Sequence, residues 1–141
     1  MNPITITIPI PPPELSPNSR AHWAARAREK AMQRMDARHA CLDAINRQRL
    51  PVPFAAVTVQ PVFFYSTSRR RDRDNAGAML KAAYDGLVDA GLLADDETLT
   101  PLAAELRADK GNPRVELIIT AEVDAVLTER QGPQGLGKPE D

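Results

Sequence analysis

The sequence predicts a mixed α/β fold, built as a single domain in which a small mixed sheet of about four strands packs against two main helices. Within residues 4–10 the run Ile-Thr-Ile-Thr-Ile has the period of two expected of a strand with one buried face. Residues 21–48 contain neither Pro nor Gly and carry apolar residues at roughly helical spacing, so we expect one long helix there. Residues 55–65 and 114–123 are rich in β-branched and aromatic residues, which predicts strands. A chain of 141 residues is long enough for one domain with a hydrophobic core.

The first half of the chain is a strand followed by the long helix. Prolines at 9 and 11–13 end the first strand, and Ser19 or Asn18 could serve as the N-cap of the helix. The side of the helix expected to be buried carries Trp23, Ala27, Ala31, Met35, Leu42 and Ile45. A basic stripe follows another side at intervals of four residues, and a solvated face explains it as well as a DNA contact does; it consists of Arg26, Lys30, Arg34 and Arg38.

The second half supplies the remaining strands and a second helix. Pro61 lies inside the 55–65 strand and therefore indicates an edge strand or a bulge. We expect two more strands at 98–107 and 114–123, joined by a hairpin loop at 109–113. Gly, Pro and charged residues dominate from about residue 128, so we expect a folded domain over 1–127 and a disordered tail over 128–141.

Composition is ordinary for a soluble globular protein, with 43% hydrophobic and 26% charged residues. No stretch resembles a signal peptide and no apolar run is long enough to span a membrane, so the expected location is the cytoplasm. The single cysteine, Cys41, is expected to be a small buried side chain. The net charge of −1 hides an asymmetry, because residues 1–73 sum to +7 and residues 74–141 to −8. This distribution fits a basic contact face and an acidic metal face, or two surfaces that attract each other in a dimer.

The stretch from residue 69 to 96 carries the candidate chemistry. Arg69, Arg70, Arg71 and Arg73 surround two aspartates, Asp72 and Asp74. In an extended segment these aspartates point the same way, and two carboxylates among arginines suit Mg²⁺ with a phosphate nearby.

A helix is expected from Asp74, its candidate N-cap, to about Ala90, with Gly91 as its C′ residue. Lys81 returns to nearly the same face as Asp74, Asp85 can pair with it, and a second acidic pair follows at 95–96.

The motifs of this stretch resemble those of the RusA-type Holliday junction resolvases of phages and prophages. Residues 69–75 read Arg-Arg-Arg-Asp-x-Asp-Asn, residues 81–87 read Lys-Ala-Ala-Tyr-Asp-Gly-Leu, and residues 90–96 read Ala-Gly-x-x-x-Asp-Asp. The Ile-Thr-Ile-Pro start and the Arg-Val-Glu-Leu-Ile-Ile-Thr strand are also similar, so the resemblance covers most of residues 2–122. One departure is the lysine, which commonly lies four residues after the second aspartate in that family and seven after Asp74 here. The extra three residues are close to one helical turn and move the lysine by about 5 Å along the axis.

The resemblance implies a dimeric, Mg²⁺-dependent enzyme that cuts four-way DNA junctions with paired nicks in recombination and repair, and Mn²⁺ could replace Mg²⁺. It also implies that Asp72, Asp74 and Asp96 hold the metal and that Lys81 is the essential cation. The four arginines would grip phosphates of the DNA. The alternative function is a junction-binding protein that keeps the fold without cleavage. The structural alternative is that Asp72 and Asp74 cap a helix while 95–96 lie in a polar turn.

Other polar residues of this stretch receive structural roles. We assign such roles to Asp85, Asp89 and Asp95, and Asn75 could orient one of the aspartates.

Chain lengths predict a homodimer with shared metal sites. A helix over 75–90 would separate its ends by about 24 Å, whereas the five residues 91–95 span at most ~17 Å. One chain therefore has difficulty bringing Asp96 to Asp72, whereas two chains with antiparallel helices bring each Asp96 beside the other chain's Asp72 and Asp74.

Overall fold

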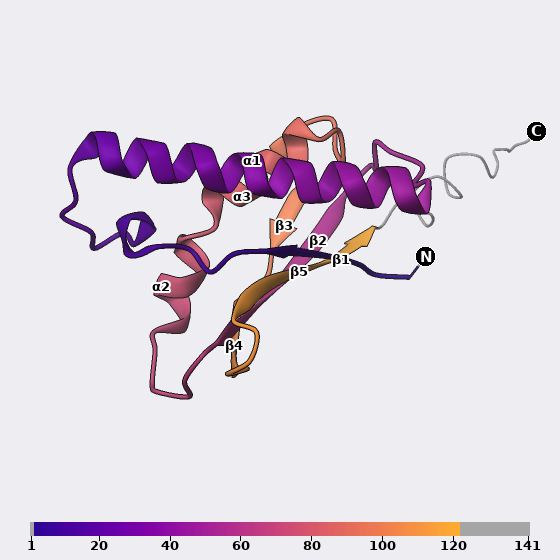
Figure 1. Cartoon of the computed structure of the whole chain (residues 1–141). Helices are drawn as coiled ribbons and strands as arrows, with labels where there is room; N and C mark the ends of the chain where they lie inside the picture. The colour runs from indigo at the N-terminus through magenta and orange to yellow at the C-terminus, as the bar shows by residue number, and fades with distance from the viewer. Residues whose placement is uncertain (1, 122–141) are drawn as a thin grey trace, which may run out of the picture.

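The computed structural model describes residues 2–121 and confirms a single mixed α+β domain (Figure 1). The elements in chain order are β1 (Ile4–Ile8), the 3₁₀ turn η1 (Pro13–Leu15), α1 (Trp23–Gln48), β2 (Val57–Tyr65), α2 (Arg73–Ala78), α3 (Lys81–Asp89), the 3₁₀ turn η2 (Asp96–Thr98), β3 (Leu99–Pro101), β4 (Glu105–Ala108) and β5 (Arg114–Ala121). Within this range the sheet has five strands rather than about four, and α1 and α3 are the two main helices. The tail expected over 128–141, and the boundary at 127, lie outside the described residues.

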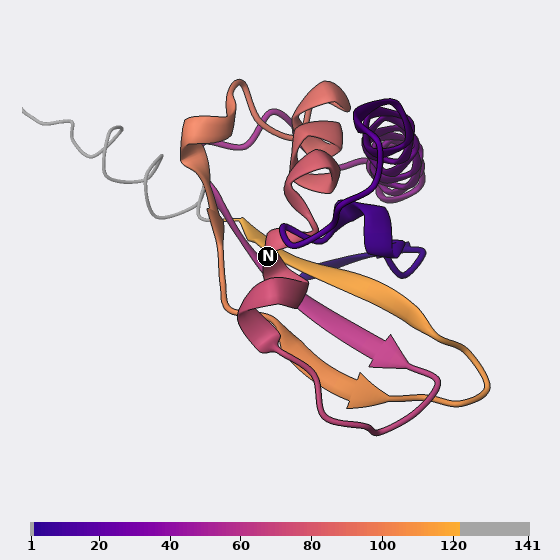
Figure 2. The same ribbon diagram turned by 90° about the vertical axis from the view of Figure 1, so that its left-hand side faces the viewer.

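The domain has two layers, with α1 and α3 side by side on one face of the sheet (Figure 2). Alternation along the strands buries one set of side chains beneath these helices. The alternation expected for β1 is confirmed, since its three isoleucines are buried and its two threonines are exposed. The fully buried residues of the other long strands are Val57, Val59, Pro61, Phe63, Val115, Leu117 and Ile119. Cys41 on α1 joins this core, and its burial raises the pKa of the thiol to about 12.

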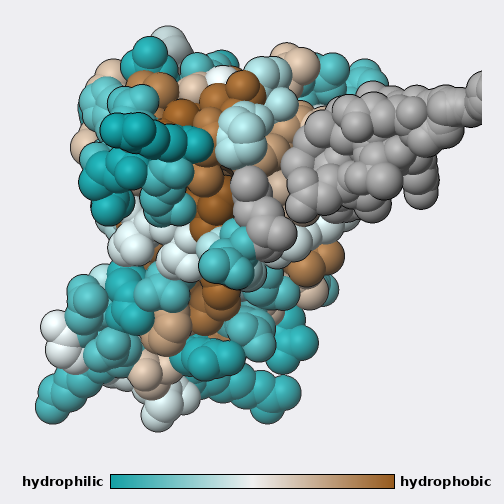
Figure 3. Space-filling view, turned by 90° about the vertical axis from the view of Figure 1, so that its right-hand side faces the viewer, coloured by the Kyte–Doolittle hydropathy of each residue, from teal (hydrophilic) through white to brown (hydrophobic). Residues whose placement is uncertain are grey.

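A view of the end from which the chain leaves β5 shows how this core meets the surface (Figure 3). A band of hydrophobic residues runs between hydrophilic residues that cover most of the rest of this face.

Strand β2 is central, so the edge position expected from Pro61 is wrong. β2 pairs antiparallel with β5 on one side and parallel with β3 and then β4 on the other. The Val59 carbonyl accepts a hydrogen bond from the Leu102 amide (2.8 Å), so the backbone of Pro61, two residues on, faces the same side. That position falls in the gap between β3 and β4, where the Gln60 side chain donates to the carbonyls of Pro61 (3.0 Å) and Ala103 (2.8 Å). Proline has no backbone N–H to donate. Pro61 is tolerated here because neither β3 nor β4 pairs with β2 at this residue.

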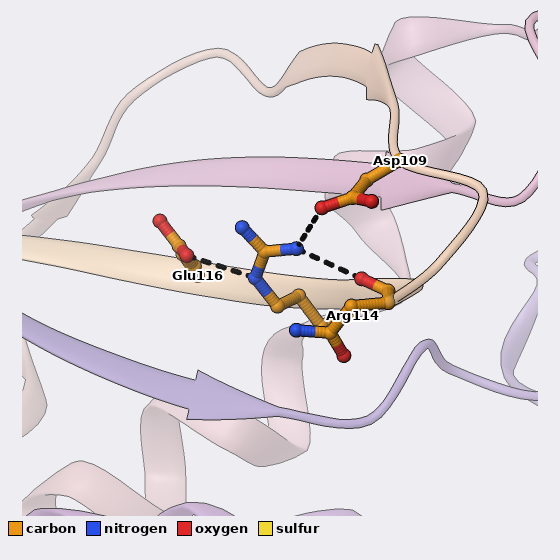
Figure 4. A network of polar contacts seen from close by, with 4 residues as sticks. Asp109, Arg114 and Glu116 are labelled. Carbon is orange, nitrogen blue, oxygen red and sulfur yellow. Dashed lines mark hydrogen bonds and ion pairs between the residues drawn. The ribbon is translucent and has the colours of Figure 1, made fainter.

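The loop at 109–113 is not a hairpin, because β4 and β5 flank β2 instead of pairing with each other. The loop crosses the end of β2, where the Asp109 amide donates to the Tyr65 carbonyl (2.7 Å). The Arg114 guanidinium holds the loop from β5 by donating to Asp109 Oδ2 (2.8 Å) and to Glu116 Oε2 (2.9 Å), as Figure 4 shows. It also lies over the Phe64 ring, 3.9 Å from the centroid. The hydrogen bond from Arg114 lowers the pKa of the Asp109 carboxyl, and the contacts together fix the crossing.

Helix α1 matches the expected range, but its start and its buried side differ from the expectation. His22 is the N-cap, with Nδ1 accepting from the Ala24 amide (3.1 Å), and Ser19 instead accepts from Ala21 in the preceding turn. The buried residues are Gln33, Ala37, Cys41 and Ala44. Trp23 and Met35, expected inside, are 74% and 56% exposed. The first turns of α1 extend past the sheet (Figure 1), and the buried side of the helix begins only at Gln33.

The helix expected over 75–90 is broken in two, at Met79 and Leu80 between α2 and α3. In a continuous helix the Ala83 amide would bond the Met79 carbonyl. Here the Gln33 side chain lies between them, accepting from the Ala83 amide (2.9 Å) and donating to the Met79 carbonyl (2.9 Å). A side chain inserted into the hydrogen-bond ladder is a recognised cause of helix breaks. The expected C-terminal end is confirmed, since Gly91 follows α3 with φ +88°.

Candidate functional site

The two aspartates of the arginine-rich motif lie at the start of α2. Asp72 is the N-cap, and its Oδ1 accepts from the backbone amides of Asp74 (2.9 Å) and Asn75 (3.3 Å). Asp74 lies in the first helical turn. The expectation that both aspartates share an extended segment is therefore wrong, and the N-cap is Asp72 rather than Asp74. The motif begins the helix at this point because an aspartate oxygen can accept the free amides of a first turn.

Two adjoining cavities collect most of the candidate site residues. The first, of about 380 Å³, is lined by Lys81, Tyr84 and Asp85 of α3 and by Asp96 of η2. The second, of about 280 Å³, is lined by Asp74 and shares Gly77, Tyr84 and Pro101 with the first. We call the pair of cavities the acidic cleft and define it by Asp74, Lys81, Asp85 and Asp96.

The acidic cleft brings together only part of the expected constellation. Lys81 and Asp96 line one cavity, Asp74 lines its neighbour, and Asp72 lines neither. Asp85, given a structural role from the sequence, lies in the cleft beside Lys81, and its spacing of four residues from the lysine was the available signal.

The structural roles given to the other two aspartates are confirmed. Asp89 pairs with both Nε and Nη2 of Arg34, which lowers the pKa of its carboxyl. Asp95 accepts from the Glu97 amide (2.9 Å) and caps η2.

Tyr84 is a polar residue of the cleft to which the sequence analysis gave no role in the site. It lines both cavities, and burial raises the pKa of its phenol to about 12. The hydroxyl is protonated at neutral pH with or without this shift, so it can donate a hydrogen bond to a group bound in the cleft.

The donors of the cleft fit magnesium chemically, although one chain does not assemble a full set of protein ligands. Across residues 2–121, no three His, Cys, Asp or Glu side chains form a group that could hold a metal ion. Mg²⁺ is, however, usually bound through one or two carboxylates, with water and substrate phosphate completing the shell. Asp85 and Asp96 in one cavity supply carboxylates of this kind.

The loop before α2 presents the arginines. Arg69, Arg70 and Arg71 line a cavity of about 570 Å³ that also includes Asp72. Arg71 is fixed in place, because its guanidinium lies 3.7 Å from the Tyr65 ring centroid and donates to the Thr67 carbonyl (3.1 Å). We call residues 66–71 the arginine loop.

The remaining residues of the motif lie close to these two features. Arg73 lines the same cavity as Asp74. The Asn75 side chain accepts from the Ser16 hydroxyl (3.3 Å), so its contact is with the segment after η1 rather than with an aspartate. None of the helices in residues 2–121 is long and apolar enough to cross a membrane.

Comparisons with known proteins identify no family for this chain. No family model matches the chain, and no curated protein matches it. Among solved structures, the periplasmic domain of Helicobacter pylori MotB aligns over 98% of this chain and 95% of its own, with 14% sequence identity and a TM-score of 0.37. A likeness at this level does not bear on fold or function.

Proposed function

We propose that the protein is a Mg²⁺-dependent endonuclease that hydrolyses phosphodiester bonds in branched DNA, with four-way junctions as the main substrate. The observation that carries the proposal is the acidic cleft, in which Asp85 and Asp96 line one cavity with Lys81 and Tyr84. The arginine loop leads into the same short helix, α2, that carries Asp74. The resemblance to RusA-type resolvases supplies the expectation of junctions rather than plain duplex.

Each residue type in the cleft suits phosphodiester hydrolysis. The reaction needs an activated water and neutralisation of the charge that builds on the phosphoryl oxygens, and a Mg²⁺ or Mn²⁺ ion held by Asp96 with Asp85 or Asp74 supplies both when bound. Lys81 provides a fixed positive charge beside the scissile phosphate. The Tyr84 hydroxyl donates a hydrogen bond to a phosphate oxygen. Arg69 and Arg70 of the arginine loop contact flanking phosphates, which positions DNA without reading its sequence.

A second candidate function is a protein that binds junctions without cutting them. The observation favouring it is that Asp72, Asp74 and Asp96 do not form one metal-binding group within residues 2–121 of a single chain. Both functions predict junction binding, and they differ in cleavage alone.

The test is incubation of the purified protein and Mg²⁺ with a labelled synthetic junction, beside duplex, flap and fork controls. We expect paired nicks in the junction, and we expect Asp96→Asn and Asp74→Asn to slow cleavage at least ~100-fold while binding stays equal or tightens. The matched control is Asp43→Asn, since Asp43 is an exposed aspartate of α1 that pairs with Arg47 (2.8 Å) outside the cleft.

Binding without nicking at any divalent metal would replace the endonuclease with the second candidate. Cleavage by Asp74→Asn at the wild-type rate would remove Asp74 from the site and leave the cavity of Asp85 and Asp96.

A further inference from the structure

A fourth cavity, of about 360 Å³, opens between α1 and the break that separates α2 from α3. Lys30 and Arg34 of α1 line one side of it, and Lys81 and Asp85 of α3 line the other. Lys81 and Asp85 also line the acidic cleft, and together with Ala78 they form the wall that the two cavities share. We call this fourth cavity the basic pocket.

The charges of the basic pocket leave two lysines unneutralised. Arg34 is engaged by Asp89 through two hydrogen bonds, one of them 2.9 Å long. Neither Lys30 nor Lys81 takes part in an ion pair within residues 2–121. The lining therefore holds one carboxylate, Asp85, and two lysines that form no ion pair within residues 2–121, so the pocket has a surplus of positive charge available to an anion.

We propose that the basic pocket binds a second phosphate of the DNA backbone, next to the phosphate that occupies the acidic cleft, with Lys30 as its principal cation. This inference rests on the proposed function, because it assumes that a DNA strand passes the cleft. Lys81 and Asp85 line both cavities, so the acidic cleft and the basic pocket lie on either side of one wall. A strand with one phosphate in the cleft can therefore place a neighbouring phosphate across the shared wall. In this proposal Lys30 of the basic stripe contacts DNA, whereas Arg34 of the same stripe forms a structural ion pair with Asp89.

The direct test is an NMR titration of ¹⁵N-labelled protein with a 5′-phosphorylated thymidine dinucleotide in metal-free buffer. We expect amide shifts at Lys30, at Ala31 and across 79–82. Lys30→Ala should abolish these shifts and Lys30→Arg should keep them, because the arginine retains the charge. The matched control is Arg28→Ala, which removes an exposed cation from the same helix but not from the pocket.

A binding measurement on an intact junction supplies the second readout. Lys30→Ala should weaken junction binding about tenfold and reduce the slope of log K against log salt by about 1, as expected for one lost phosphate contact. Arg28→Ala should leave both quantities unchanged.

The inference is overturned if the dinucleotide shifts no amide of the basic pocket, or if Lys30→Ala and Arg28→Ala behave alike. Neither measurement depends on cleavage. A wild-type protein that shifts at the pocket yet never nicks a junction contradicts the proposed endonuclease and leaves the phosphate site standing.

Discussion

Gln33 reaches 46 and 50 residues along the chain to contact Met79 and Ala83. Its amide can both donate and accept, so one side chain satisfies the carbonyl and the amide that the helix break leaves open. Gln33 is only 7% exposed, and burial of these backbone groups without a partner would cost free energy. The start of α3, which carries Lys81 and Asp85, is therefore held in place by a residue of α1.

Replacing this amide should destabilise the fold. Gln33→Met keeps the length of the side chain and removes both hydrogen bonds, so the free energy of unfolding should fall by about 1–3 kcal/mol. Urea unfolding followed by circular dichroism measures the change. Gln48→Met, at the exposed end of α1, is the control and should stay within about 0.5 kcal/mol of the wild type. Equal stability of the two variants would mean that the ladder closes without Gln33.

Among elements, α1 and α3 pack in close contact at Gly86. A Cβ atom added there would lie 2.3 Å from the Arg34 carbonyl oxygen and 3.0 Å from the Ala37 Cβ, so no larger residue fits without separating the helices. Gly77 on α2 offers the opposite case, because a Cβ there would lie 3.9 Å from the Ala104 Cβ, in ordinary contact.

These two glycines give a matched pair of substitutions. Gly86→Ala should lower the free energy of unfolding by about 1–3 kcal/mol, as overpacking does. Gly77→Ala should leave it unchanged or raise it by up to about 1 kcal/mol, because alanine favours the helix. Thermal and urea unfolding of both variants would check this. A Gly86→Ala protein as stable as Gly77→Ala would contradict the close crossing.

The elements that the sequence predicted well are those whose pattern is local. The alternation of β1, the uninterrupted run of α1 and the β-branched β5 follow from neighbouring residues, and so does the Gly91 end of α3. The break before α3 depends on Gln33, and the central place of β2 depends on where β3 and β4 pair. Neither contact has a signal in the residues next to it. The same holds for the site, where Lys81 and Asp96 were identified by motif but the position of Asp72 outside the cleft depends on tertiary packing.

At the scale of the whole molecule, the structure changes the expectation that two chains share each metal site. The sharing of Asp96 between chains assumed one straight helix from 75 to 90, and the break between α2 and α3 removes that premise. Asp74 and Asp96 of one chain line adjoining cavities. We retain the homodimer as a proposal, because paired nicks in two strands need two sites, and we now expect each site to be built within one chain.

Mixing two inactive variants distinguishes a metal site built within one chain from one shared between two chains. If each site belongs to one chain, heterodimers of Asp74→Asn with Asp96→Asn carry one lesion in each site, and junction cleavage should stay absent. Subunit exchange is followed with two different affinity tags, and the oligomeric state by light scattering. Cleavage that returns after exchange would show that the two aspartates act across the subunit boundary.

The position of β2 has a consequence for the order in which the protein is made. Its neighbours on both edges follow it in the chain, and β1 is joined to the sheet only through β5. During synthesis the strand Val57–Tyr65 therefore leaves the ribosome with both edges unpaired, and it keeps one of them open until Arg114–Ala121 arrives. Open edges of apolar strands are sites of aggregation. A chain that ends before residue 114 lacks β5, so β1 has no partner strand and β2 keeps one edge unpaired. Nearly the whole domain must therefore be synthesised before the edges of these strands are paired.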